Sequence, residues 1–149
     1  MPSDIYGQPS NRYEMFLPIM FAETRLKSQY AGGFKLHITV AAEQAEPLAR
    51  VILPALERIH HKVVLPGGHY ARLNEGNERG KFITIYPGPA APSQHVLDAI
   101  DPLLLQLRSQ GIRPGPVPTT RQSNHAEAEI RIGHSGLVRT YWAENYRTT

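Results

Sequence analysis

The segment 34–40, Phe-Lys-Leu-His-Ile-Thr-Val, carries a lysine and a histidine two residues apart. Its apolar and polar residues alternate, which predicts a strand with Lys35 and His37 on one face, about 7 Å apart. A fixed cation beside a titratable imidazole can neutralise an anionic leaving group and supply it with a proton. The alternative is an exposed sheet face on which this pair has no catalytic role.

A second lysine, Lys62, lies in another short and β-branched segment, His-His-Lys-Val-Val. Only four of the sixteen basic residues are lysines, and three of these four lie in apolar, strand-like segments, where a lysine is costly without a partner or ligand. If its strand lies beside that of Lys35, clustered cations lower the pKa of Lys62 and make its amine a usable general base. The alternative is a lysine at a sheet edge with its amine in water.

The segment 80–88, Gly-Lys-Phe-Ile-Thr-Ile-Tyr-Pro-Gly, predicts a third strand. If its isoleucines face the core, Thr84 and Tyr86 face the same side as the lysines. Lys81 has the opposite parity, so it joins them only if the strand begins after it or contains a bulge. The alternative for Tyr86 is ordinary packing.

Three arginines could bind an anion. Arg131 opposes the apolar residues of an alternating segment at 126–132, where its planar fork could hold a phosphate. The alternative is a surface pair with Glu129, which contributes little to stability. Arg72 and Arg79 lie in a Gly- and Asn-rich segment, 67–80, which we expect to be a loop able to fold over an anion.

The elements expected to position these residues form an α+β pattern. Apolar spacing predicts two amphipathic helices, each kinked by an internal proline, and a short helix or helix pair that ends at Gly32–Gly33. Alternation predicts strands, and the proline-rich segment before the last of them is expected to be irregular. We therefore predict a small mixed sheet of about four to five strands with two kinked amphipathic helices packed on one face. The helices are expected at 12–31, 43–59 and 93–110, and the strands at 34–40, 61–65, 80–88, 126–132 and 137–142.

Length and composition limit the organisation of the chain. Its 149 residues, of which 41% are hydrophobic, predict a single domain over residues 1–149 with a flexible arm at 1–11. No apolar run approaches the roughly 20 residues of a transmembrane helix, and the N-terminus is not that of a signal peptide. We therefore expect a cytoplasmic protein with no membrane partner.

Several classes of function are excluded by missing motifs. The absence of cysteine excludes disulfides and thiolate metal sites, and His60 and His61 have no metal-site spacing, so we expect neither metal nor cofactor. Nucleotide-binding loops and the Gly-x-Ser-x-Gly motif are absent. The net charge of +3 is mild and the aromatic residues do not alternate with basic ones, so no nucleic-acid partner is expected.

Four stretches together resemble the lyase domain of class III and class IV lanthipeptide synthetases. The phosphothreonine lyases that pathogens secrete as type III effectors share the same core. The resemblance covers roughly residues 32–136, most of the chain. The stretches are GGFKLHITVAAEQAEPLARVILPAL, HHKVV, RGKFITIYPG and EIRIGHSG.

This resemblance implies a role for each matching residue. Lys62 would remove the α-proton of a phosphoserine or phosphothreonine, and His37 would protonate the departing phosphate. Lys35 and Arg131 would bind that phosphate, and Tyr86 would orient it or the lysine. The products would be dehydroalanine or dehydrobutyrine, formed without a metal or nucleotide.

The sequence departs from the family pattern at two positions. Gly76 stands where the family carries an arginine, so Arg72 or Arg79 must take over, or the contact is missing. Lys81 matches a family lysine to which the pattern assigns no role here.

The chain lacks the kinase and cyclase domains of a synthetase. We therefore expect a stand-alone lyase that acts on a phosphorylated precursor peptide alongside separate kinase and cyclase proteins. One alternative is an effector acting on a host phosphoprotein, although an arm of about ten polar residues is short for a secretion signal. Another is a phosphopeptide-binding module without turnover.

Overall fold

A computed structural model describes residues 4–16, 20–122 and 125–147. Within these residues the main sheet has seven strands, and every pairing between them is antiparallel. The chain is α+β, but the expected mixed sheet of four to five strands is wrong. The strands, in their order across the sheet, are β1 (Tyr13–Phe16), β2 (Phe21–Thr24), β4 (His61–Val64), β5 (Ile83–Gly88), β3 (Gly33–Ile38), β9 (Val138–Ala143) and β8 (Ile130–Ile132).

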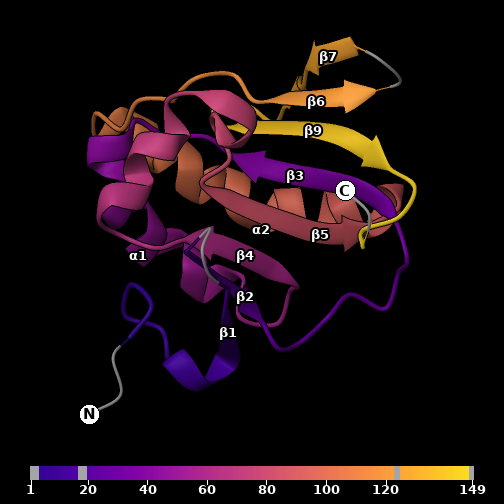
Figure 1. Ribbon diagram of the computed structural model, residues 1–149, viewed down its shortest axis with the longest axis horizontal. Helices are drawn as coiled ribbons and strands as arrows, with labels where there is room; N and C mark the ends of the chain where they lie inside the picture. The colour runs from indigo at the N-terminus through magenta and orange to yellow at the C-terminus, as the bar shows by residue number, and fades with distance from the viewer. Residues whose placement is uncertain (1–3, 17–19, 123–124, 148–149) are drawn as a thin grey trace.

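Two α-helices pack against one another, and α2 lies behind β5 and β3 in Figure 1. They are α1 (Ala45–Ala55) and α2 (Ala90–Ser109). Helix α2 begins three residues earlier than expected, because Ser93 does not cap it: its hydroxyl donates to the Gly88 carbonyl. Short 3₁₀ turns occur at Ser10–Arg12 (η1), Ala42–Gln44 (η2), Gly68–Leu73 (η3) and Gly76–Glu78 (η4). Among the described helices, none combines the length and apolar character needed to cross a membrane.

The helix expected at 12–31 is also wrong, since strands β1 and β2 form a hairpin there. Strand β2 pairs with β4, so Phe21 lies opposite Val64 and Ala22 opposite Val63. This pairing satisfies the backbone of β2 and buries Ala22 completely. Tertiary pairing thus outweighs a weak local helical pattern.

The alternating segment at 126–132 is not one strand, as expected, but two. Strand β7 (His125–Ala128) pairs with β6 (Thr119–Gln122) in a separate two-stranded sheet, and β6 occupies part of the segment expected to be irregular. Strand β8 follows and pairs with β9 at one edge of the main sheet. Figure 1 shows the β6–β7 hairpin above β9.

The two faces of the main sheet differ in chemistry. Leu36, Ile38, Ile83 and Ile85 are fully buried and belong to one core cluster with apolar residues of both helices. The opposite face of the same strands therefore carries Lys35 and His37 from β3 and Thr84 and Tyr86 from β5. We call it the polar face of the sheet.

The segment before β1 contacts the core as well. Ile5 and Tyr6 are buried, and the Tyr6 hydroxyl donates to the Val64 carbonyl at 2.6 Å. Tyr6 and Tyr70 also share a hydrogen bond of 2.6 Å between their hydroxyls. The segment is thereby tied to β4 and to the turn η3.

Candidate active site

Three of the predicted residues lie in one row across the polar face. Thr84 of β5 pairs with Lys62 on one side and with His37 on the other. Strands are about 4.8 Å apart, so the backbones of Lys62 and His37 are about 10 Å apart. Lys62 and Lys35 do face the same side, but β5 lies between their strands.

A second row lies beside the first. Lys35 is opposite Tyr141 of β9, and its Nζ lies 5.4 Å from the Tyr86 ring centroid and 5.8 Å from that of Tyr141. A register irregularity between Phe34 and Leu36 accompanies this approach of β3 to β5. Burial, followed by the charges of nearby lysines, lowers the pKa of Lys35 to about 8.

A buried carboxylate orients His37. Its Nδ1 lies 2.6 Å from Oε1 of Glu129, and both side chains are almost completely buried. The second carboxylate oxygen accepts a hydrogen bond from the Thr120 hydroxyl. Since a carboxylate only accepts, Nδ1 carries the proton and Nε2 is the atom left for a ligand.

Burial and the hydrogen bond between His37 and Glu129 shift the pKa of each residue in opposite directions. Burial lowers the pKa of His37, although the hydrogen bond to Glu129 works against it. Burial would raise the pKa of Glu129, but the hydrogen bond and charge of His37 bring it below its ordinary value. Glu129 is therefore a carboxylate that holds the imidazole in one tautomer.

Sequence reasoning missed Glu129 as a site residue. Its neighbour Arg131 suggested a surface pair, but Glu129 is 3% exposed and Arg131 is exposed. Glu129 lies between β7 and β8, where the chain passes from one sheet to the other. A local pattern does not reveal this change of partner, and the only available signal was an acidic residue within a short alternating segment.

The amine of Lys62 borders a small cleft of about 30 Å³, whose wall includes Glu78, Lys81 and Thr84. Strand β5 begins at Ile83, after Lys81, which is the condition under which Lys81 could join the polar face. Burial lowers the pKa of Lys62, while Glu78 and Glu23 work in the opposite direction. An amine in this environment loses its proton more readily than one in water.

The three predicted arginines occupy different positions relative to the row of Lys62, Thr84 and His37. Arg72 is exposed in η3, and Arg79 donates a hydrogen bond of 3.3 Å to the Thr119 hydroxyl. Neither lines the cleft beside Lys62. Arg131 lies in the edge strand β8, two strands from His37, with Arg139 of β9 between them.

Arg139 was not predicted from the sequence. It pairs directly with His37, and one of its terminal nitrogens donates to the Glu129 carbonyl at 3.3 Å. Its Nε is buried and has no hydrogen-bond partner among the residues that the structure describes. A buried guanidinium nitrogen without a partner is unfavourable, and a bound anion would satisfy it.

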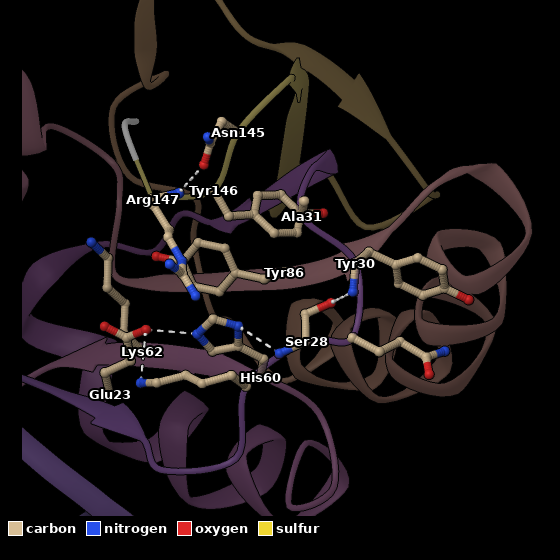
Figure 2. A pocket seen from close by; sticks show the side chains of 12 residues that line it. Glu23, Ser28, Tyr30, Ala31, His60, Lys62, Tyr86, Asn145, Tyr146 and Arg147 are labelled. Carbon is tan, nitrogen blue, oxygen red and sulfur yellow. Dashed lines mark hydrogen bonds and ion pairs between the residues drawn. The ribbon is translucent and has the colours of Figure 1, made fainter.

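A larger pocket of about 730 Å³ opens beside Lys62 and Tyr86. The loop between β2 and β3 and the segment 145–147 form much of its wall. Figure 2 shows His60 between Glu23 and Ser28: Nε2 lies 2.6 Å from the Glu23 carboxylate, and Nδ1 accepts the Ser28 amide hydrogen at 3.1 Å. Tyr86 stacks on His60 with ring centroids 4.2 Å apart, so this network supports the tyrosine.

His61 points the other way, into the core, as expected for adjacent histidines on a strand. It is fully buried, and its Nε2 accepts a hydrogen bond of 2.7 Å from Tyr13. Over the described residues, no three histidine or acidic side chains gather in a way that could hold a metal ion. The polar face instead presents lysine, histidine, arginine and tyrosine, a set suited to a phosphate group.

The fold is similar to that of phosphothreonine lyases. The type III effector and phosphothreonine lyase OspF from Shigella flexneri superposes with a TM-score of 0.52 and 17% identity, over 94% of this chain and 76% of that one. The phosphothreonine lyase effector VirA (SpvC) from Chromobacterium violaceum gives a TM-score of 0.57 and 20% identity, over 95% and 69%. No protein-family model and no curated protein sequence matches this chain. At these identities the likeness concerns the fold alone.

Proposed function

We propose that the protein is a carbon–oxygen lyase that eliminates phosphate from phosphoserine or phosphothreonine in a peptide. The observation that carries this proposal is the row Lys62–Thr84–His37 on the polar face, with Lys35 and Tyr86 in the adjoining row. A base, an acid and a binding site for a dianion are the groups that this β-elimination requires.

In the proposed reaction Lys62 acts as the base. Its neutral amine takes the α-proton of the phosphorylated residue, and the electrons of the broken C–H bond form the Cα=Cβ double bond. The bond between Cβ and the phosphate oxygen breaks, and the phosphate leaves with the electron pair of that bond. The products are dehydroalanine or dehydrobutyrine and inorganic phosphate.

His37 acts as the acid in this proposal. Glu129 holds Nδ1, so Nε2 is the atom that delivers a proton to the leaving oxygen. Burial lowers the pKa of His37 in the free protein, whereas a bound phosphate dianion raises it. Substrate binding thus favours the protonated imidazole that the reaction consumes.

Lys35 and Arg139 are the residues that we place on the phosphate. Lys35 adjoins Tyr86, whose hydroxyl stays protonated because burial raises its pKa, so it can donate a hydrogen bond. Arg139 lies beside His37 with an unsatisfied nitrogen. We place Arg131 and Arg79 farther out, as contacts to the peptide. Lys81 lines the cleft beside Lys62 and its charge also acts on Lys35 and His37, so we place it within the site.

We further propose a precursor peptide as the substrate, with elimination being a step in lanthipeptide-type biosynthesis. The four sequence stretches that resemble synthetase lyase domains support this choice. A kinase must supply the phosphorylated residue, and a cyclase could add a cysteine thiol to the product. We expect the gene of this protein to lie beside kinase and cyclase genes and a gene for a short Ser/Thr-rich peptide.

A second candidate is an effector that acts on a phosphoprotein of a host cell. The two solved structures described above are phosphothreonine lyase effectors, which favours this reading. The chemistry is the same, so the two candidates differ in substrate. Elimination from phosphorylated precursor peptides but not from folded phosphoproteins would support biosynthesis, and the reverse preference would support an effector.

The test of the activity itself uses a phosphothreonine peptide. The wild-type protein should release inorganic phosphate and leave an unsaturated residue that captures an added thiol, as mass spectrometry would show. Lys62→Ala should lose this activity roughly 10²–10⁴-fold, the usual contribution of a general base. Peptide binding by the wild-type protein without phosphate release would overturn the lyase proposal and favour a binding module.

A further inference from the structure

An aromatic pair lies directly beside the proposed base. The Nζ of Lys62 lies 4.6 Å from the centroid of the Phe21 ring in β2. On its other side Phe16 of β1 stacks on Phe21, with centroids 5.1 Å apart and planes 14° apart. Phe16, Phe21 and Val64 are paired across three neighbouring strands, so the pair shares the polar face with Lys62.

Phe21 is the principal support of the Lys62 amine. Among the described residues, Lys62 makes no hydrogen bond and no ion pair that would fix its amine, and the Phe21 ring is the contact that the structure records. A lysine side chain loses about 2 kcal/mol of rotamer entropy when held in one place. A cation over an aromatic face provides a directional attraction that offsets part of this cost.

We infer that Phe21, backed by Phe16, is a positioning residue that holds the Lys62 amine over the substrate and keeps water from it. This inference rests on the proposed function in naming Lys62 as the base. Phe21 lines the small cleft of about 30 Å³ beside Lys62, whereas the larger pocket of about 730 Å³, which Lys62 also lines, leaves room for a substrate.

The Phe21 ring acts on the amine in two opposing ways. Its bulk excludes water and so favours the neutral amine, whereas its π-face favours the ammonium. Other charges face the amine from each neighbouring element. They are Glu23 on β2, Glu78 on η4, Lys81 before β5 and Lys35 on β3.

Substitutions at Phe21 separate these two effects. Phe21→Ala removes both and opens the amine to water, so the pKa of Lys62 should rise and the acid limb of the kcat/KM profile should move to higher pH. Phe21→Leu keeps apolar bulk without the π-face, so the limb should move to lower pH. Phe21→Tyr keeps the ring and should behave like the wild type.

The pKa of the Lys62 amine can be followed without turnover. Its reaction with an amine-selective acylating reagent is measured against pH by peptide mass spectrometry. Lys27, whose side chain is 46% exposed, provides the internal reference in the same molecule. Met15→Ala is the matched control, because Met15 lies on the same hairpin, faces the other way and is exposed.

The expected result is a shift of Lys62 reactivity in opposite directions for Phe21→Ala and Phe21→Leu, with Lys27 unchanged. At neutral pH kcat/KM should fall roughly 2- to 30-fold in Phe21→Ala, the range of a cation–π contact. Unchanged Lys62 reactivity in both variants would overturn the inference. Shifted reactivity in a protein that eliminates no phosphate would keep the Phe21–Lys62 coupling and reject the proposed function.

Discussion

His37 and Lys62 have different tasks in the proposed reaction, although they lie in one row. Lys62 removes a proton from carbon, a step that every substrate needs. His37 protonates a leaving group, so its importance depends on the basicity of that group. The buried Glu129 belongs to the His37 half of the site and Phe21 to the Lys62 half.

A sulfothreonine peptide separates the two tasks. Sulfate leaves without needing a proton, so His37→Ala should regain most of its activity on this substrate relative to the phosphothreonine peptide. Lys62→Ala should stay inactive on both, because the α-proton must still be removed. Rates of formation of the unsaturated residue, measured by mass spectrometry, provide the comparison. Equal losses for both variants on both peptides would show that the roles are assigned wrongly.

Glu129→Gln tests the orientation of His37. The amide keeps the shape of the carboxylate but lacks its charge, so activity should fall on the order of 10²-fold, at the low end for acid–base catalysis. Without the negative charge the pKa of His37 falls further, and the basic limb of the kcat profile should move to lower pH. Thr120→Val, which removes only the hydroxyl that donates to Glu129, should have a smaller effect. A pH profile unchanged in Glu129→Gln would contradict this role.

At the scale of elements, the approach of β3 to β5 sets the distance between Lys35 and Tyr86. Gly33, at the start of β3, has a φ of +139°, and a Cβ there would lie 2.3 Å from the Gly88 carbonyl group. This backbone conformation and this spacing require glycine.

Gly33→Ala should therefore destabilise the protein. Backbone strain alone costs about 1–3 kcal/mol of unfolding free energy, and the clash with β5 adds to it. Urea unfolding monitored by circular dichroism measures the change. Gly68→Ala is the control, because a Cβ there meets no atom within 4 Å, and its effect should stay within about 0.5 kcal/mol. Equal stabilities of the two variants would contradict the close approach.

For the whole molecule, His61 and Glu23 are two of the groups that make folding stability depend on pH. Burial lowers the pKa of His61 to about 4. Burial would raise the pKa of Glu23, but the hydrogen bond to His60 and the charge of Lys27 lower it to about 2. In both cases the unfolded chain binds protons at a higher pH than the folded one, so both contributions to stability are lost on acidification.

The free energy of unfolding should fall first between about pH 6.5 and 4, as His61 is protonated in the unfolded chain, and again between about pH 4.5 and 2 through Glu23. His61→Gln should reduce the loss of stability in the upper pH window, and Glu23→Gln should reduce it in the lower one. Urea midpoints measured across this pH range provide the test. A wild-type curve that is flat from pH 6.5 to 4 would contradict the buried, neutral His61.

Much of the site could be predicted from local periodicity. Alternation placed Lys35 with His37 and Thr84 with Tyr86 on faces opposite the buried aliphatic residues, and the structure confirms both parities. The strands at 34–40, 61–65 and 80–88 and the two long helices were also predicted, with small differences in their ends. These features depend on side chains two to four residues apart, which one stretch of sequence contains completely.

Strand order depends on contacts that no single stretch contains, and the tertiary structure decided it. The residues 13–24 form a mostly apolar stretch, interrupted by Pro18, whose pattern does not distinguish a helix from a hairpin. Pairing with β1 and β4 makes β2 a strand. Glu129 and Arg139 reach His37 because β9 pairs with β3 and the chain before β8 turns inward. Sequence alone thus determined which side chains share a strand face, because period and parity are local. Which strands adjoin, and so which charges meet at His37, was decided by the burial of both helices and seven strands around one core.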